Sequence, residues 1–123
     1  MIHFLNPGYS YYRQTALDET KRSVKANAGN VYGFTFINSN TVPVYIKFYN
    51  ALVGDVTVGT TVPLTVLMVP AGNGTTPGQV VATVEDAPFA HFNTGITIAA
   101  VTGVADSSTG APTTDLHAEV VYR

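Results

Sequence analysis

The sequence predicts a small all-β protein that folds as a single antiparallel β-sandwich. Of its 123 residues, 17 are valine and 17 are threonine, whereas only 14 are charged. Valine and threonine favour strands because their branched Cβ packs well on a pleated surface. These residues occur in short alternating runs that are interrupted by glycine, proline and asparagine. Such runs, with no helical period between them, are typical of a sandwich or a barrel.

The length and the absence of cysteine limit how this fold is stabilised. A chain of 123 residues is typical of one domain, which buries about two thirds of its extended surface. Without cysteine, the fold must rest on packing and backbone pairing rather than on disulfides or thiolate metal sites. No apolar run approaches the roughly 20 residues that span a bilayer, and no secretion signal is seen. We therefore expect a soluble, unprocessed chain with no membrane partner.

The first element, residues 1–25, is expected to be an N-terminal arm apart from a sandwich domain over residues 26–123. The arm contains four basic and two acidic residues, a net charge of +2. Residues 26–123 contain two basic and six acidic residues, a net charge of −4. Its aromatic residues surround Pro7-Gly8 with too few aliphatic neighbours for a core strand. Fifteen extended residues reach about 50 Å, far enough to touch a neighbouring subunit. A turn or short helix over 17–25 is expected to lead into an edge strand at 23–25.

From residue 30 onward, the alternation predicts strands at residues 31–37, 42–49, 62–69, 79–85, 89–92, 96–101 and 116–122. The first two are expected to form an antiparallel hairpin through the turn Asn38-Ser39-Asn40. The strand at 62–69 is almost wholly apolar, so both of its faces are expected to be covered. The loop at 102–114 is expected to cross one end of the sandwich. Jelly-roll and immunoglobulin-like topologies both fit this order.

Period-2 alternation also predicts which side chains share a face. In the strand at 31–37, Tyr32, Phe34 and Phe36 are expected on one face. In the last strand, Leu116, Ala118, Val120 and Tyr122 alternate with the polar His117 and Glu119. These assignments define a candidate core and a candidate solvent face.

Catalytic and metal-binding patterns find no match, so the chain is predicted not to be an enzyme. His3, His91 and His117 lack the close spacing of a helical metal motif. No serine lies in a Gly-x-Ser-x-Gly elbow. Glu85 and Asp86 are adjacent, so on a strand they would point to opposite faces, unlike a glycosidase pair. No catalytic residue, metal or cofactor is expected, and the few dispersed cations argue against a nucleic-acid partner.

The aromatic residues near the N-terminus are the candidate partner-binding residues. Tyrosine is well suited to interfaces because it combines apolar area with a hydroxyl group and only two rotatable angles. Tyr9, Tyr11 and Tyr12 lie too close together for all of them to enter the domain's own core. The predicted contact residues are Phe4, Tyr9, Tyr11, Tyr12 and Arg13. In a different interpretation, Tyr45 and Tyr49 on one strand face form a platform on which a sugar stacks.

Several short stretches resemble small virion structural proteins of tailed bacteriophages. They are Gly29-Asn30-Val31-Tyr32-Gly33-Phe34, Phe36-Ile37-Asn38, Val44-Tyr45-Ile46-Lys47-Phe48-Tyr49, Val58-Gly59-Thr60, Pro63-Leu64, Val69-Pro70-Ala71-Gly72, Phe92-Asn93-Thr94-Gly95-Ile96-Thr97-Ile98-Ala99 and Thr102-Gly103-Val104-Ala105-Asp106. The likeness covers about residues 20–123 and rests on strands and turns. The N-terminal arm lies outside it.

This resemblance implies a head decoration protein on the outer capsid surface of a virion. Such a protein is expected to form a homo-oligomer, a trimer, and to bind the major capsid protein. The alternative is a carbohydrate-binding module of a tail tip or spike, an adhesin that uses an exposed tyrosine face or the loop at 102–114.

Overall fold

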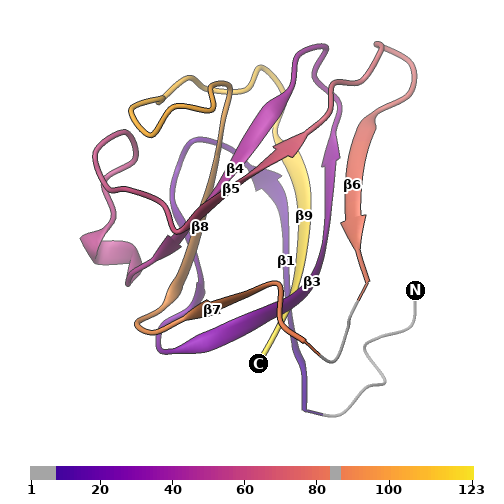
Figure 1. Ribbon diagram of the computed structural model, residues 1–123. Coiled ribbons are helices and arrows are strands. Elements are labelled where there is room, and N and C mark those ends of the chain that lie inside the picture. Colours follow the sequence, from indigo (N-terminus) through magenta and orange to yellow (C-terminus); the bar gives the residue numbers. More distant parts are fainter. Residues whose placement is uncertain (1–7, 84–86) are drawn as a thin grey trace.

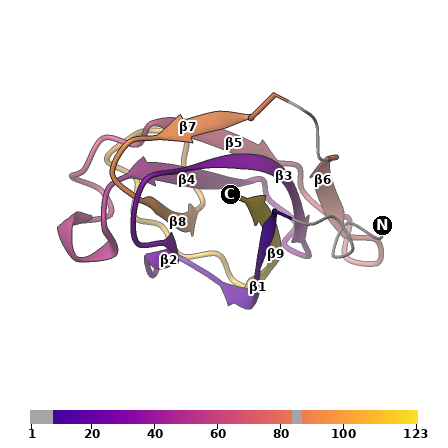
Figure 2. The same ribbon diagram turned by 90° about the horizontal axis from the view of Figure 1, so that it is seen from below.

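The computed structural model describes residues 8–83 and 87–123, and it confirms the predicted all-β sandwich. Two antiparallel sheets pack together around a hydrophobic core (Figure 1; Figure 2). A single 3-10 turn at Val53–Asp55 is the only helical element of the described residues.

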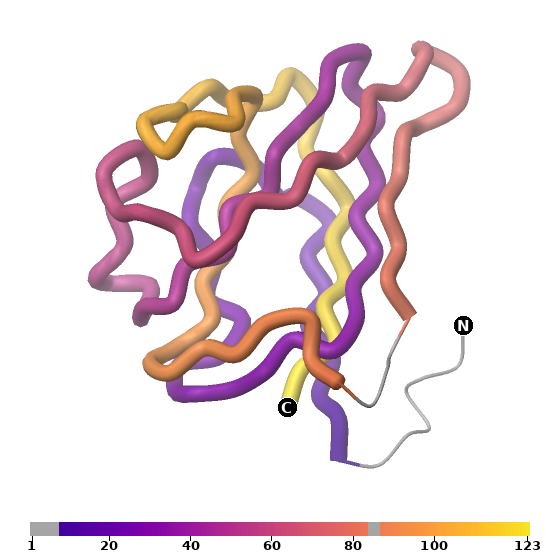
Figure 3. Tube along the Cα trace, viewed as in Figure 1, coloured from indigo at the N-terminus to yellow at the C-terminus, as the bar shows by residue number. Residues whose placement is uncertain are grey.

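Sheet A has the strand order β1 (Ser10–Leu17), β9 (Leu116–Tyr122), β3 (Gly29–Asn38) and β6 (Gly78–Ala82), and β7 (Ala90–Phe92) also pairs with β3. Sheet B has the strand order β2 (Arg22–Lys25), β8 (Ile96–Val101), β4 (Val44–Asn50) and β5 (Thr65–Val69). The chain therefore crosses between the sheets at most of its connections, as its path in Figure 3 shows. One side of the sandwich ends in β1 and β2, and the other in β6 and β5.

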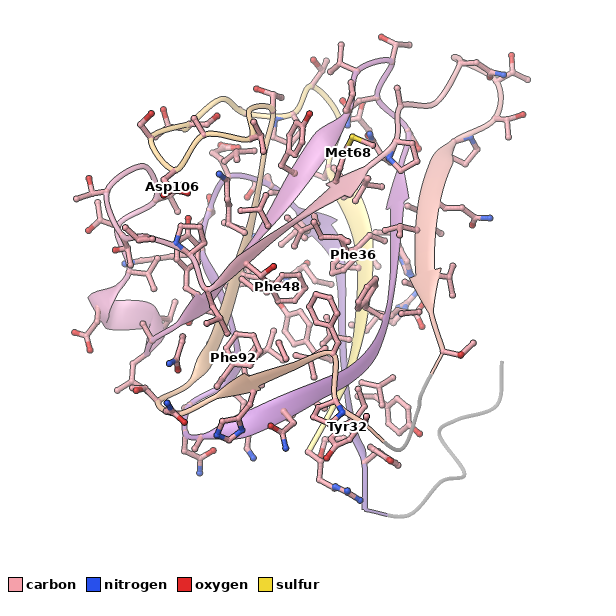
Figure 4. The ribbon with its side chains drawn as sticks, in the orientation of Figure 1. Tyr32, Phe36, Phe48, Met68, Phe92 and Asp106 are labelled. Atoms are coloured by element: carbon pink, nitrogen blue, oxygen red, sulfur yellow. The ribbon has the colours of Figure 1, made fainter. Side chains whose placement is uncertain are left out.

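The core is built around a cluster of phenylalanines that both sheets supply. Phe36 of β3 and Phe48 of β4 are fully buried, and their ring centroids lie 6.1 Å apart at a steep angle. Phe92 of β7 extends the cluster, with its ring centroid 6.3 Å from that of Phe48. All three point into the space between the sheets (Figure 4). Burial of each such ring contributes about 1.5–3 kcal/mol, so this cluster is a main source of stability.

A β-bulge changes the predicted face of Tyr32. The register between β3 and β9 shifts between Val31 and Gly33. A bulge inserts one extra residue, so the alternation changes phase there. Val31, Phe34 and Phe36 consequently belong to the core, while Tyr32 lies outside that cluster. The expectation that Tyr32 shares a face with Phe34 and Phe36 was wrong.

The expected boundary between an arm over residues 1–25 and a domain over 26–123 is corrected by the two N-terminal strands. β1 pairs with β9 in sheet A, and β2 pairs with β8 in sheet B. The edge strand expected at 23–25 is present, as part of β2. β1 was not predicted, because backbone pairing holds an edge strand in place and such a strand needs few aliphatic side chains. Residues 1–7 lie outside the described residues.

The expected hairpin between β3 and β4 is also wrong, since these strands lie in different sheets. The predicted turn is present, but there the chain crosses the sandwich. Buried Asn38 fixes the crossing: its Nδ2 donates to the carbonyl of Val42 at 3.0 Å, and its Oδ1 accepts from the backbone N–H of Asn40 at 2.9 Å. β5 differs from expectation as well, because it is an outermost strand and Met68 on it is 50% exposed.

Candidate interaction surface

The outer face of sheet B is covered by a further layer of the same chain. We call this layer, formed by residues 51–62 and 102–110, the covering layer. Lys47 on β4 is fully buried beneath it, and its Nζ donates to the carbonyls of Val104 at 2.8 Å and Ala105 at 2.7 Å. Thr97 on β8 is equally buried and donates from Oγ1 to the carbonyl of Ala51 at 2.8 Å. Hydrogen bonds thus fasten both segments of the layer to the sheet.

Burial under the covering layer shifts the pKa of two side chains. Burial lowers the pKa of Lys47, although the nearby carboxylate of Asp106 acts in the opposite direction. Burial raises the pKa of Tyr49, and the charge of Asp106 raises it further. Tyr49 packs with Val56 and Ala99 under the layer. Figure 4 labels Asp106 in the loop that leads away from β8.

The outer face of sheet A carries exposed or half-buried side chains on β1, β9 and β3, although Val121, opposite Tyr11, is only 2% exposed. Register places Arg13 of β1 opposite Glu119 of β9, and Glu119 opposite Thr35 of β3. His117 of β9 lies opposite Ile37 of β3 in the neighbouring row. Side chains that are directly opposite in register are neighbours on one face, with Cβ atoms about 4.5–5.5 Å apart. Together with Tyr11, these residues form the open face, which comprises Tyr11, Arg13, Thr35, Ile37, His117 and Glu119.

The open face combines apolar and charged groups. Tyr11 is 38% exposed, and Arg13, two positions further along β1 on the same face, is also exposed. His117 Nε2 lies 2.6 Å from Glu119 Oε2, and the two side chains are 25% and 43% exposed. A protonated His117 thus forms an ion pair with Glu119, while Arg13 stands across from the same carboxylate. A tyrosine beside groups of both charge signs is a composition suited to contact with another protein surface.

The five predicted contact residues are separated by the structure. Tyr11 and Arg13 reach the open face. The side chain of Tyr12 is turned inward and packs against the core, so it is not part of this face. Tyr9 packs on Tyr32 of the same chain, as described below, and Phe4 lies outside the described residues. Alternation along one strand places neighbours on opposite faces, and this explains why Tyr11 and Tyr12 diverge.

Sequence reasoning assigned no role to Thr35, Ile37, His117 or Glu119 in this surface. The alternation of the last strand did place His117 and Glu119 on a common polar side, and this is the signal that pointed to them. Their proximity to Arg13 depends on the order of strands in sheet A, which no local pattern gives.

A second aromatic group lies at the end of the sandwich where Figure 4 labels Tyr32. The rings of Tyr9 and Tyr32 meet edge to face, with centroids 5.1 Å apart. The guanidinium of Arg123 lies 4.7 Å from the Tyr9 centroid and 5.0 Å from that of Tyr32. Hydrogen bonds from Arg123 and then Asn30 lower the pKa of Tyr32. This group fixes the start of β1 to the end of β9.

The proposed sugar platform of Tyr45 and Tyr49 is not open, because Tyr49 is only 1% exposed under the covering layer. A separate small cleft of about 250 Å³ lies at one end of the sandwich; it is lined by Ser39, Asn40, Thr41, Val42, Thr113 and Thr114. Asn40 holds its wall in place, since its side chain bonds the backbone N–H of Thr114 at 2.7 Å and the carbonyl at 2.8 Å.

Within residues 8–83 and 87–123, no helix has the length and hydropathy to cross a bilayer. The same ranges contain no group of three or more histidine, aspartate or glutamate side chains placed to hold a metal ion. Comparison of the chain with protein-family models, with curated proteins and with solved structures found no match.

Proposed function

We propose that this chain is a structural protein of a tailed-bacteriophage virion, a decoration protein that binds the outer surface of the head. The observation that supports this most is the contrast between the two outer faces of the sandwich. The chain buries Lys47, Tyr49 and Thr97 of sheet B under its own segments, whereas the side chains of the open face of sheet A are exposed or half-buried. The resemblance of its strand and turn motifs to small virion proteins points to the same class.

In this proposal the open face contacts the major capsid protein. Tyr11 supplies a large apolar contact, and the tyrosine side chain loses little conformational entropy when it is fixed. Arg13 and Glu119 set the orientation of the contact, because paired charges at an interface penalise wrong registers. The rigid sheet behind them keeps these side chains in place before binding. Homo-oligomerisation belongs to the proposal, and the trimer implied by the resemblance stays a prediction.

The second candidate is the carbohydrate-binding adhesin, which the small cleft favours. Ser39, Thr41, Thr113 and Thr114 bring hydroxyl groups to its rim, and these can exchange hydrogen bonds with a sugar. The cleft touches the end of the loop at 102–114 that sequence analysis named. A glycan array separates the candidates: binding that Thr114→Val and Thr41→Val abolish supports the adhesin.

Co-sedimentation with capsids tests the decoration role. Point variants are used because residues 10–17 form a strand of sheet A, so truncation would unfold the surface under test. Tyr11→Ala and Arg13→Glu are each expected to weaken binding at least about tenfold, the effect of losing 1.4 kcal/mol at an interface. The capsids are those of the phage that encodes the chain, assembled without it.

Matched controls change exposed groups on the other side of the molecule. Val104→Ala removes an exposed apolar side chain from the covering layer, and Asp55→Lys changes the charge by two units there. Both are expected to bind as the original chain does. Equal retention of Tyr11→Ala, Arg13→Glu and the controls on capsids would contradict the proposal.

A further inference from the structure

One side of the sandwich is built from a stretch without any charged residue. Between Asp55 and Glu85 the sequence contains no lysine, arginine, aspartate or glutamate. This stretch supplies β5 and β6, the outermost strands of sheets B and A on the same side of the sandwich. We call the pair of strands the uncharged edge. In Figure 1, β6 runs down the right side of the molecule, β5 crosses it diagonally, and the loop that joins them lies at the upper right.

The uncharged edge is a well-defined part of the fold. The connecting loop is tightened by Asn73, whose Oδ1 accepts from the backbone N–H groups of Thr75 at 2.9 Å and Thr76 at 2.7 Å. Gly78 then begins β6 in direct contact with the chain that leaves β5, because an added Cβ there would overlap the carbonyl of Pro70. The two edge strands are thus held at a fixed spacing.

Large apolar side chains are exposed along this edge. Leu64, just before β5, is 48% exposed, and Met68 within β5 is 50% exposed. Val81 on β6 is 51% exposed. An outermost strand also directs part of its backbone N–H and C=O groups away from its sheet, where another strand can pair with them. Register places Val81 opposite Thr35 on the outer face of sheet A and Met68 opposite Tyr45 on the outer face of sheet B, so these apolar side chains flank the free pairing groups of the edge.

The opposite side of the sandwich carries features that prevent strand pairing. β1 contains Arg13, and β2 contains Arg22 and Lys25. Arg22 lies opposite Ile98, a core residue, so its side chain is directed inward from the edge, and its buried Nε has no hydrogen-bond partner among the described residues. Charges on edge strands, and inward-pointing charges above all, are known devices against edge-to-edge association. The uncharged edge has neither.

We propose that the uncharged edge binds a second copy of this chain, with β6 antiparallel to β6 about a two-fold axis. If the axis passes through Val80, Gln79 of each chain faces Val81 of the partner subunit, and no charges meet. The same pairing of β2 would bring Arg22 and Lys25 of both copies together around the axis, and like charges near one another across a strand pair are destabilising. The chain's own charges thus allow self-pairing at one side and oppose it at the other.

A two-fold axis perpendicular to the sheets also accounts for the second edge strand. Such an axis keeps each sheet in its own layer while it reverses strand direction, so it brings β5 of both chains to the same junction. Both sheets then continue across the dimer. This inference deepens the proposed structural role, and its test uses the isolated protein without a capsid. It competes with the trimer expected from the resemblance, because an isologous two-fold contact closes as a dimer.

Sedimentation velocity of the full chain over a range of concentrations tests this pairing. The chain as it exists is expected to sediment as a dimer that dissociates on dilution. The double variant Gln79→Lys with Val81→Lys sets lysines opposite each other at two places across the axis. We expect it to raise the dimer dissociation constant at least about tenfold. Circular dichroism confirms that it is folded.

A charge-swapped variant makes the test specific to the antiparallel register. Gln79→Glu with Val81→Lys sets opposite charges against each other at the same two places, so the dimer is expected to return. Ser23→Lys, on the opposite edge, serves as a control without effect. A chain that stays monomeric at all concentrations, a trimer unaffected by the lysine pair, or equal effects of both double variants would overturn the inference. Each of these results leaves the capsid-binding test untouched.

Discussion

Lys47 is the clearest case of a single residue that organises a larger part of this molecule. Its ammonium group is buried, and backbone carbonyls of Val104 and Ala105 accept its hydrogen bonds. Hydrogen bonds from a charged donor are about twice as strong as neutral ones. The side chain therefore holds the covering layer against sheet B, although burial of the charge itself is unfavourable.

The unfavourable burial of the Lys47 charge predicts that the free energy of unfolding depends on pH. Burial lowers the pKa of Lys47 below its ordinary value of 10.5. Between the native pKa and 10.5 the unfolded chain binds more protons, so the free energy of unfolding rises with pH in this window. Tyr49 acts oppositely: its pKa is raised above 10.0, and the stability it contributes is lost as pH rises. Lys47→Met in a Tyr49→Phe background is expected to remove the rise.

Urea unfolding at a series of alkaline pH values checks this expectation. The reference is the Tyr49→Phe chain, which keeps Lys47 and every titrating group except Tyr49. Identical dependence of the unfolding free energy on pH in the two chains would show that Lys47 has the same pKa in the native and unfolded states, which contradicts its burial.

At the scale of elements, the loop between β5 and β6 depends on the absence of a side chain at residue 78. An added Cβ at Gly78 would overlap the Pro70 carbonyl and lie 2.8 Å from that of Ala71. Backbone atoms cannot move aside as a flexible side chain does. Gly78→Ala is therefore expected to lower the free energy of unfolding by about 1–3 kcal/mol, the usual effect of overpacking.

Gly54→Ala is the matched control, because an added Cβ there meets nothing within 4 Å. Its effect is expected to stay within about 0.5 kcal/mol, as for an ordinary surface substitution. Urea midpoints of the two variants give the comparison. Similar midpoints for both variants would mean that the chain between β5 and β6 shifts easily. The inference that β5 and β6 are held at a fixed spacing would then be wrong.

The strands that local patterns predicted best are those whose alternation is aliphatic. β8 and β9 begin and end where the sequence places them, since each begins with alternating aliphatic residues and follows a turn-forming segment. β1 was missed because tyrosine, arginine and glutamine occupy a strand that backbone pairing holds at an edge. The bulge at Tyr32 was invisible, because alternation continues in the sequence while the backbone changes phase.

Connections between strands were less predictable than the strands. A turn such as Asn38–Asn40 shows where a strand ends, but it does not determine whether the next strand pairs with it or crosses to the other sheet. The open face illustrates the consequence: Arg13 and Glu119 are more than a hundred positions apart, and only the pairing of β1 with β9 brings them together. The sequence therefore predicted two residues of the open face, Tyr11 and Arg13, but not the residues of β3 and β9 that lie beside them.

For the whole molecule, the distribution of chemistry over its surfaces is uneven in a consistent way. One sheet is covered by the chain's own segments, and the other is open. The edge strands β1 and β2 contain basic residues that oppose strand pairing, and the edge strands β5 and β6 contain no charged residue. Under the two proposals, Tyr11 and Arg13 of β1 contact the lattice and the backbone of β6 contacts a second copy, so the two contacts use different strands of sheet A. Gln79 and Val81 of β6 nevertheless lie opposite Ile37 and Thr35 of the open face.

The proposed binding to a capsid lattice predicts how capsid stability responds to the amount of protein. A ligand that binds only the assembled state stabilises it by RT ln(1 + [L]/Kd), about 2.7 kcal/mol per site at a hundred times Kd and about 1.4 kcal/mol more for each further tenfold. The temperature at which capsids break is therefore expected to rise linearly with the logarithm of added protein. Light scattering during heating measures it. Arg13→Glu should shift this line to higher concentration without changing its slope, because it alters Kd alone. A breaking temperature that stays constant while the protein co-sediments with capsids would mean that it binds without cementing them.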